Sequence, residues 1–247
     1  MAENKIHLAV ILGDGVGHDI LPVSTQVITE AASVCGVEVT HEVFSYGAQR
    51  YLEEGAPLPE DVPALVHDLA AKHDAIMFGS AGDDPRVPAG INCRSLLVGL
   101  RWELDLFVNL RPAPLLDHRF CPLKKKVPID LVVVRENTEG VNVRMGGNFK
   151  RGTTDEVAIQ EDINTYKGVE RICRFAFEYA RSHGYSKVTM ADKYVSLIHA
   201  HDLWQRVFWQ MSEEFPNIEG EHYFIDTLCM DLVQFPEHFG VIVTNNM

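Results

Sequence analysis

Short apolar runs alternate with longer segments of helical periodicity along the chain. Strands are predicted at residues 6–12, 37–44, 75–78 and 131–134. Helices are predicted at residues 19–32, 59–71 and 95–104. The first helix should bury one face, formed by Ile20, Val23, Val27, Ile28 and Ala31. Strands that alternate with helices predict an α/β fold with a mostly parallel sheet and helices on both faces.

The same alternation continues in the second half of the chain. A strand at 106–110 should stop at Arg111-Pro112, and residues 141–159 read as β structure broken by glycines. Further helices are expected at 164–181, 198–215 and 228–235, and short strands at 188–190, 223–225 and 240–243. The final core-like strand runs almost to Met247, where a polar tail is more usual, so we expect the fold to continue beyond this residue.

Composition excludes several classes of function. The 247 residues carry a formal net charge of -13, and the one basic run is Lys124-Lys125-Lys126, so nucleic acid is not an expected partner. The five cysteines are scattered without a CxxC pair, which is typical of free thiols, and no Cys/His spacing predicts a zinc site. The N-terminus lacks a secretory signal and no apolar stretch approaches ~18 residues, so no membrane span is expected and the predicted location is cytoplasmic.

A glycine-rich turn follows the first strand. Gly13 and Gly15 fit the first two positions of the dinucleotide fingerprint GxGxxG, but His18 stands where the third glycine should be. The residues therefore favour a tight turn that leads into a helix over a phosphate-binding loop.

Charged residues stand at the ends of several predicted elements. Arg101 closes a helix, Arg111 follows a strand and Arg135 ends another, and arginine forks bind carboxylates. Lys193 and Asp226 each follow a short strand, where a lysine could transfer a proton and an aspartate could hold a divalent metal. The three arginines are equally explained as ordinary surface residues. Lys193 and Asp226 are equally explained by a salt bridge or a helix cap, without any binding site. The charged residues alone leave these alternatives open.

Several longer motifs resemble one enzyme family. They occur in family order along the whole chain: "ILGDGVGHDI", "GINCRSLLVGLRWELDLFVNLRPAPLL", "VVVRENTEG", "ADKYVS", "FIDTLCMDLV" and "VIVTNNM". Together they resemble the β-decarboxylating dehydrogenases, which include the isocitrate and 3-isopropylmalate dehydrogenases. The resemblance implies an isopropylmalate dehydrogenase-like fold. Residues 1–105 would form half of a large, cofactor-side domain whose other part follows Met247, and residues 106–247 a small substrate and dimerisation domain.

The resemblance also implies a reaction and its cofactors. A 2-hydroxy dicarboxylic acid is oxidised with NAD, or with NADP, and loses carbon dioxide with the help of Mg²⁺ or Mn²⁺. Residues 140–159 would form an arm that interlocks with a second copy, so a homodimer is expected. Cofactor contacts are implied at Leu12 and Val195, although Val195 replaces a family asparagine.

Roles for individual residues follow from the same resemblance. Arg101, Arg111 and Arg135 would bind the substrate carboxylates, Lys193 would take the hydroxyl proton and Asp226 would bind the metal. Asn142 occupies the position of the family's proton-donating tyrosine, and an amide cannot replace that acid.

The helix that begins near Ser95 should determine which substrate is used. Leu97 stands where isocitrate-using relatives have an asparagine, and Leu96 and Leu97 resemble the leucine pair that contacts an isopropyl group, so 3-isopropylmalate (leucine biosynthesis) is favoured. Isocitrate or tartrate-type substrates are the alternative. A non-catalytic, substrate-binding or regulatory relative, or an inactive fragment, is the alternative from another class.

Overall fold

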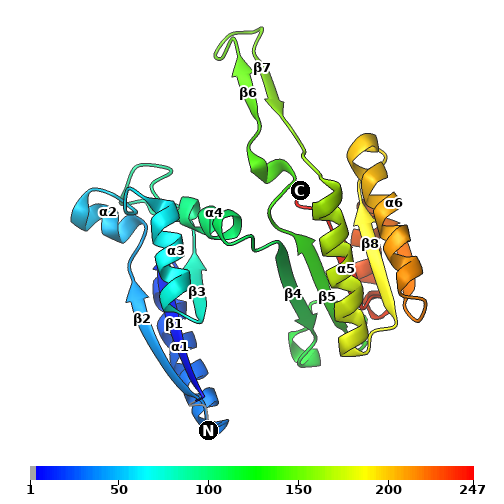
Figure 1. Cartoon of the computed structure of the whole chain (residues 1–247), viewed down its shortest axis with the longest axis horizontal. Helices are drawn as coiled ribbons and strands as arrows, with labels where there is room; N and C mark the ends of the chain where they lie inside the picture. Colours follow the sequence, from blue (N-terminus) through cyan, green and yellow to red (C-terminus); the bar gives the residue numbers. More distant parts are fainter. Residues whose placement is uncertain (1–3) are drawn as a thin grey trace. The chain divides into compact units, whose positions relative to one another are not determined.

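The computed structural model describes residues 4–247 and shows two compact units, divided between Asp105 and Leu106 (Figure 1). Each unit is built around its own sheet, with parallel strand pairs in the majority, so the predicted α/β class is confirmed. The cofactor-side and substrate roles expected for the two parts of the chain stay predictions.

The first unit has a three-stranded parallel sheet in the order β2-β1-β3. Its strands are β1 (Lys5–Gly13), β2 (Glu38–Phe44) and β3 (Ala75–Ser80). Its helices are α1 (Gly17–Val34), α2 (Ala48–Glu54), α3 (Val62–Lys72) and α4 (Arg94–Glu103). Alternate residues of β1 serve opposite faces, because Ala9 and Ile11 pack with α3 and α4 while Leu8 and Val10 pack with Leu21 of α1.

Two sequence predictions for this unit are wrong in detail. The face expected to be buried on α1 is exposed at Ile20, Val23, Val27 and Ile28, because Leu21 and Thr25 face the sheet instead. Helix α3 begins at Val62 rather than at residue 59, because the Asp61 side chain accepts a hydrogen bond from the Ala64 amide (2.9 Å) and so caps the helix.

The second unit contains a five-stranded sheet in the order β4-β5-β10-β8-β9. Its strands are β4 (Val108–Pro114), β5 (Asp130–Glu136), β8 (Lys187–Asp192), β9 (Glu219–Phe224) and β10 (Val241–Thr244). All are parallel except β4, which pairs antiparallel with β5 at the edge. The expected stop at Arg111-Pro112 is therefore wrong. An edge strand tolerates Pro112 and Pro114 because the proline nitrogens, which lack a proton, need not pair with a neighbour.

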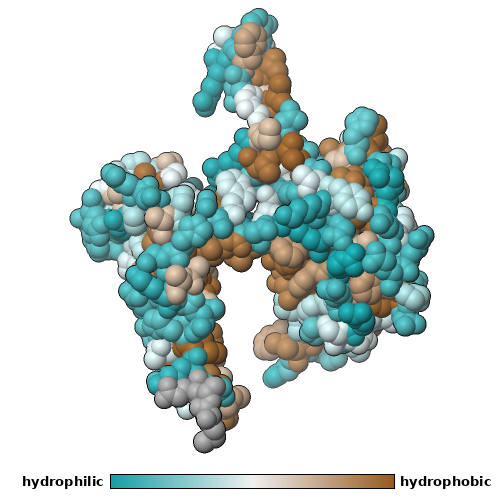
Figure 2. Space-filling model, in the orientation of Figure 1, coloured by the Kyte–Doolittle hydropathy of each residue, from teal (hydrophilic) through white to brown (hydrophobic). Residues whose placement is uncertain are grey.

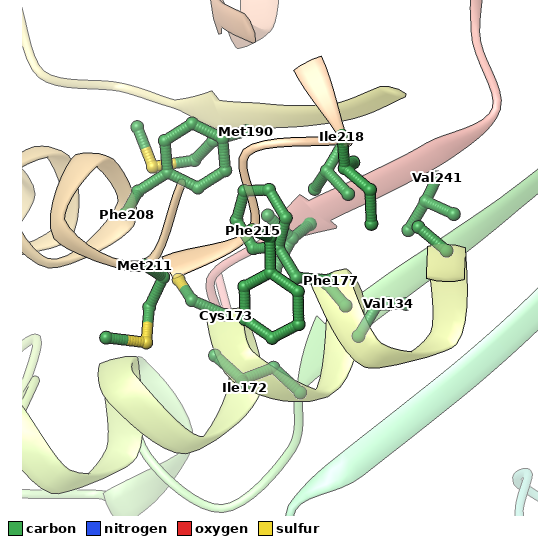
Figure 3. Close-up of a cluster of buried hydrophobic side chains, with 14 of the residues drawn as sticks. Val134, Ile172, Cys173, Phe177, Met190, Phe208, Met211, Phe215, Ile218 and Val241 are labelled. Carbon is green, nitrogen blue, oxygen red and sulfur yellow. The ribbon is translucent and has the colours of Figure 1, made fainter. Parts of the chain in front are cut away.

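Helices α5 (Tyr166–His183), α6 (Ile198–Glu214) and α7 (Ile225–Gln234) complete this unit. The Thr165 side chain caps α5 by accepting a hydrogen bond from the Gly168 amide, and Gly184 ends it in the left-handed conformation. Figure 3 shows how side chains from α5 and α6 fill the space against the sheet. Phe177 stacks between Phe208 (ring centroids 5.4 Å apart) and Phe215 (5.3 Å). Full burial of such rings stabilises this unit.

A β-hairpin projects from the second unit (Figure 1). It consists of β6 (Gly146–Phe149) and β7 (Val157–Gln160), and it follows a 3-10 turn at Val141–Val143. Phe149 pairs with Val157, and Ile159 lies two residues further along β7, so the three side chains share one face. All three are exposed, and Figure 2 shows hydrophobic surface along this projection.

Candidate functional site

The parallel strands of the second unit have their carboxyl ends on the same side of the sheet, and residues at these ends line a pocket of about 160 Å³. The lining residues are Arg135, Asp192, Lys193, Ile225, Thr244, Asn245 and Met247. Such an edge is where ligands bind in open α/β sheets, because polar side chains and loop backbone converge there. Two of the predicted site residues, Arg135 and Lys193, are thus brought to the same pocket.

Lys193 forms an ion pair with Asp226 across this edge. Asp226 is the second residue of α7, where the helix dipole favours a negative charge. Its side chain is 72% exposed, compared with 31% for Lys193. The pair therefore places a solvent-accessible carboxylate beside a lysine at the pocket, and it is also the salt bridge that the sequence left as an alternative, so the roles of both residues stay predictions.

Asp192, directly before Lys193, is buried and anchors the loop. Its carboxylate accepts hydrogen bonds from Gln205 Nε2 (3.1 Å) and the Tyr194 amide (3.0 Å), and it lies 3.1 Å from His222 Nε2. Burial alone would raise the pKa of Asp192, but the interaction with His222 and these hydrogen bonds outweigh burial and lower it. An ionised Asp192 thus fixes the backbone that carries Lys193.

His201 supports the same loop and was not predicted as a site residue. Its Nδ1 accepts a hydrogen bond from the Lys193 amide (2.7 Å), and its Nε2 lies 3.0 Å from the Asn245 side chain. Burial lowers the pKa of His201, although Asp192 and Asp162 oppose the shift. The sequence signal was weak, because a histidine on the inner face of a helix is usually a core residue.

Arg135 and Asn142 meet at a third side chain, Asn246. The Oδ1 atom of Asn246 accepts hydrogen bonds from the Arg135 guanidinium and from Asn142 Nδ2, the latter at 2.6 Å. The Nδ2 atom of Asn246 donates to the Glu139 carbonyl (2.9 Å), which fixes the orientation of the amide. Asn142 therefore lies beside a candidate substrate arginine and is held there by an amide network.

The polar segment after β5 is mainly structural. The buried Glu136 accepts hydrogen bonds from the Thr138 amide, the Thr138 hydroxyl and the Glu139 amide, each at 2.8 Å. Glu139 in turn accepts hydrogen bonds from the Thr165 amide (2.8 Å) and hydroxyl (2.5 Å) at the start of α5. The two glutamates thus fasten the turn between the pocket and the hairpin.

Arg111 lies on the exposed side of edge strand β4 and does not line the pocket. Its Nε donates a hydrogen bond to Asn109 Oδ1 (2.8 Å), and Asn109 pairs with Arg135 in the strand register. Arg111 and Asn109 share a strand face because they are two residues apart. The side chain is therefore directed by Asn109, while its predicted role in carboxylate binding stays a prediction.

The candidates of the first unit lie on α4 and at the end of β1. Leu97 and Arg101 are four residues apart on α4, so they share a helix face, and both are half-buried. Leu96 is fully buried in the core of this unit, and its predicted contact with the substrate stays a prediction. Ser95 is exposed and Leu12 is half-buried. Among the second unit's candidates, Val195 is 71% exposed.

The glycine turn after β1 is packed closely against Ser80 and hydrogen-bonded to neighbouring backbone. A Cβ on Gly13, whose φ is +72°, would lie 2.1 Å from the Ser80 carbonyl oxygen. Asp14 accepts hydrogen bonds from the Ala48 amide (2.8 Å) and the Cys93 amide (3.1 Å), and burial, followed by the bond to Asp14, raises the pKa of Cys93 to about 12. The turn leads from β1 into α1, as predicted, and it packs closely against the end of β3.

Comparison with known proteins identifies the family. The sequence-family model of the isocitrate/isopropylmalate dehydrogenases matches residues 7–247 of this chain. The chain belongs to this family. Within this isocitrate/isopropylmalate dehydrogenase family, the chain is 42% identical over 241 residues to a 3-isopropylmalate dehydrogenase of Bifidobacterium longum subsp. infantis, covering 97% of this chain and 68% of the relative.

Other members of the family agree with this match. A 3-isopropylmalate dehydrogenase of Streptomyces avermitilis is 40% identical, with 98% of this chain and 68% of the relative covered. The crystal structure of isocitrate dehydrogenase from Methylococcus capsulatus has a TM-score of 0.82 and 31% identity, covering 98% of this chain and 67% of that one. The predicted family and its fold are thus confirmed, and the chain spans about two thirds of these relatives.

Members of the isocitrate/isopropylmalate dehydrogenase family typically use NAD or NADP and a divalent metal. Asp226 fits the metal, because Mg²⁺ and Mn²⁺ prefer oxygen ligands and bind through one or two carboxylates together with substrate oxygens. For the nucleotide, Leu12 and Val195 stay the predicted contacts. Within residues 4–247, the helices fall short of the length and apolarity needed to cross a membrane.

Proposed function

We propose that this chain takes part in the oxidative decarboxylation of a 2-hydroxy dicarboxylic acid, with 3-isopropylmalate as the substrate, NAD as the oxidant and Mg²⁺ or Mn²⁺ as the metal. The supporting observation is the meeting of Arg135 and Lys193 in one pocket, with Asp226 paired to Lys193. A guanidinium can bind a carboxylate through two hydrogen bonds, and an amine beside it can accept the proton of the neighbouring hydroxyl.

The protein's own groups account for binding and for one proton transfer. Arg135, with Arg101 and Arg111, would hold the carboxylates, and Asp226 would hold the metal, which acts as a Lewis acid when bound. With a cation held at Asp226, Lys193 would lose its ion pair, and its side chain, once it has released a proton to solvent as the neutral amine, could take the hydroxyl proton. NAD, when bound, supplies the hydride acceptor of the reaction.

Selectivity is assigned to α4. Leu97 offers hydrocarbon where an asparagine would bind a third carboxylate, and a buried carboxylate without a partner costs ~1–3 kcal/mol or more. The isopropyl group of 3-isopropylmalate leaves no such group unpaired. Isocitrate should therefore be the poorer ligand.

Asn142 favours a second candidate, a relative that binds substrate without efficient turnover. When carbon dioxide leaves, its bonding electron pair stays on the substrate, and the carbon must then take up a proton. The Asn142 amide already donates to Asn246 and does not titrate in a useful range, so it cannot serve as this acid. Under this alternative the arginines would still bind the hydroxy acid.

Calorimetry with 3-isopropylmalate, isocitrate and tartrate in the presence of Mg²⁺, together with the absorbance of reduced nicotinamide, separates these functions. We expect 3-isopropylmalate to bind most tightly, and Arg135→Gln to weaken binding about tenfold or more. Arg119→Gln, at an exposed arginine paired with Asp117, is the control and should have no effect. Binding with NADH formation that Lys193→Gln abolishes supports the enzyme, and binding alone supports the second candidate. If none of the three acids binds, both are wrong.

A further inference from the structure

Three potential metal ligands meet in the first unit, away from the pocket described above. His7 lies on β1, Glu42 on β2 and His73 directly after α3, and these elements lie side by side (Figure 1). One ring nitrogen from each histidine and one Glu42 carboxylate oxygen lie within 4.8 Å of one another. The parallel register that pairs His7 with Thr40 places Glu42 diagonally opposite His7 on the same face of the sheet.

The buried His73 presents an unpaired nitrogen to this cluster. Its Nδ1 lies 2.9 Å from the Leu69 carbonyl oxygen, and a carbonyl only accepts, so Nδ1 carries a proton. In the neutral ring Nε2 therefore has a free lone pair. Among residues 4–247, this Nε2 has no hydrogen-bond partner, and the side chain is 1% exposed.

The nearest charged group to this lone pair is another acceptor. Glu42 Oε2 lies 3.4 Å from His73 Nε2. Although this distance is within hydrogen-bond range, His73 Nε2 has no hydrogen-bond partner in the described part of the chain, so the carboxylate does not satisfy it. A cation bound between the two groups would satisfy both of them.

His7 is positioned to complete a metal site. Its amide donates to Asp74 Oδ2 (2.8 Å) and its carbonyl accepts from the Asp74 amide (2.8 Å), so the backbone is held on both sides. Its ring stacks on His73 with centroids 4.7 Å apart, and its Nδ1 contacts the Thr40 hydroxyl at 2.8 Å. Thr40 would orient the His7 ring, because a hydrogen bond to the ring nitrogen that does not bind the metal fixes the orientation of a metal-bound histidine.

We propose that His7, Glu42 and His73 bind a divalent transition-metal ion, with Zn²⁺ the best fit. Two imidazoles and a carboxylate suit zinc, whereas Mg²⁺ and Ca²⁺ require oxygen ligands. Ligand bonds of ~2.1 Å in a tetrahedron separate donor atoms by roughly 3.4 Å, and the His73–Glu42 separation already has this value. The partly exposed His7 ring closes the site by tilting out of its stack, and water fills the fourth position.

This site would fasten the first unit together. His7 and His73 are separated by 66 positions, and Glu42 comes from the strand between them in sequence. An ion bound by all three would link β1, β2 and the end of α3, and it would stabilise the folded state because the unfolded chain does not present the ligands together. The site does not depend on the function proposed above.

Zinc titration of the chelator-treated 247-residue protein tests the proposal, with excess Mg²⁺ to occupy oxygen-only sites. We expect one zinc ion bound per chain and a higher unfolding temperature with zinc. Glu42→Gln and His7→Gln, both at solvent-accessible ligands, should each weaken binding by about tenfold or more. His41→Gln is the matched control, because His41 precedes Glu42 but points to the other face of β2.

Cobalt provides the second readout. Co²⁺ bound by nitrogen and oxygen should give a visible absorption band without the sulfur charge-transfer band that cysteine ligands produce, and the band should disappear in both ligand variants. Zinc affinity unchanged in Glu42→Gln and His7→Gln would overturn the proposal. So would the absence of zinc binding by the parent protein.

Discussion

Glu136 offers a sharp test of how the pocket is held in place. Its carboxylate accepts three hydrogen bonds from Thr138 and Glu139, each 2.8 Å long, and it is 2% exposed. Hydrogen bonds to charged groups are worth about 1.5–3 kcal/mol each. Glu136→Gln keeps the shape but turns one acceptor into a donor, so it should lower the free energy of unfolding of the second unit by about 2 kcal/mol.

Glu136→Ala removes all three acceptors. The simple sum overstates the loss, because Thr138 and Glu139 are half-buried and water can reach their freed groups. We expect about 3–4 kcal/mol, with faster hydrogen exchange at the Thr138 and Glu139 amides. Glu178→Gln, at an exposed glutamate of α5, should change stability by less than ~0.5 kcal/mol.

Urea unfolding with exchange mass spectrometry of a peptide that spans residues 136–142 measures both effects and separates the second unit from the first. Two results would contradict this role of Glu136: a Glu136→Gln variant as stable as the Glu178 control, or unchanged exchange at the turn. Either result would mean that the turn is held by contacts other than this carboxylate.

Three further predictions concern other parts of the chain. Native Cys93 should resist thiol reagents, because burial raises its pKa to about 12, while the exposed Cys35 and Cys229 should react; peptide mapping after brief labelling would show the difference, and rapid labelling of Cys93 would contradict it. Because the pKa of His201 is lowered in the folded state, the unfolded state takes up a proton at a higher pH than the folded state does. The free energy of unfolding should therefore be unaffected by this group above about pH 6.5 and should decrease as the pH falls from there toward the pKa of the folded state. Urea unfolding at about pH 7.5 and about pH 5.5 should show a smaller difference in His201→Gln than in the parent, and an unchanged difference would count against this role. Ile159→Asp on the apolar face of the hairpin should weaken the proposed homodimer in sedimentation experiments, whereas Ala158→Asp on the opposite face should not; equal effects of the two would argue against a dimer contact through this face.

The sequence predicted elements well where apolar periodicity was strong and failed where tertiary contacts decide. The helix predicted at 164–181 appears as α5, because its apolar residues recur at helical spacing and Thr165 caps it. The buried face of α1 was predicted on the wrong side, because both sides contain apolar residues and only contact with the sheet selects Leu21. Strand β4 continues through Pro112 because it lies at the edge of the sheet. The prediction ended the strand too early because an edge position is not visible in the sequence.

The site was predictable to the extent that motif residues end strands of one parallel sheet. Arg135 and Lys193 were placed correctly at one edge, since parallel strands bring their carboxyl ends together. His201 was missed because it lies outside the quoted motifs, and Asn246 was given no role although it lies within VIVTNNM. The contacts of His201 with Asn245 and of Asn246 with Arg135 join residues far apart in sequence. The same limit applies to His7, Glu42 and His73, which no ligand spacing could have grouped.

The edges of the five-stranded sheet have a consequence for how copies of the chain can associate. One edge strand contains Pro112 and Pro114, which have no amide proton to offer to an incoming strand, and the other presents the acidic side chains Glu219 and Glu221. Both features discourage a second molecule from extending the sheet by strand addition. Even at high concentration, copies of the chain should therefore not add strand to strand into an open-ended sheet, as amyloid-forming proteins do. Association is left to other surfaces, whose contacts can form a closed oligomer.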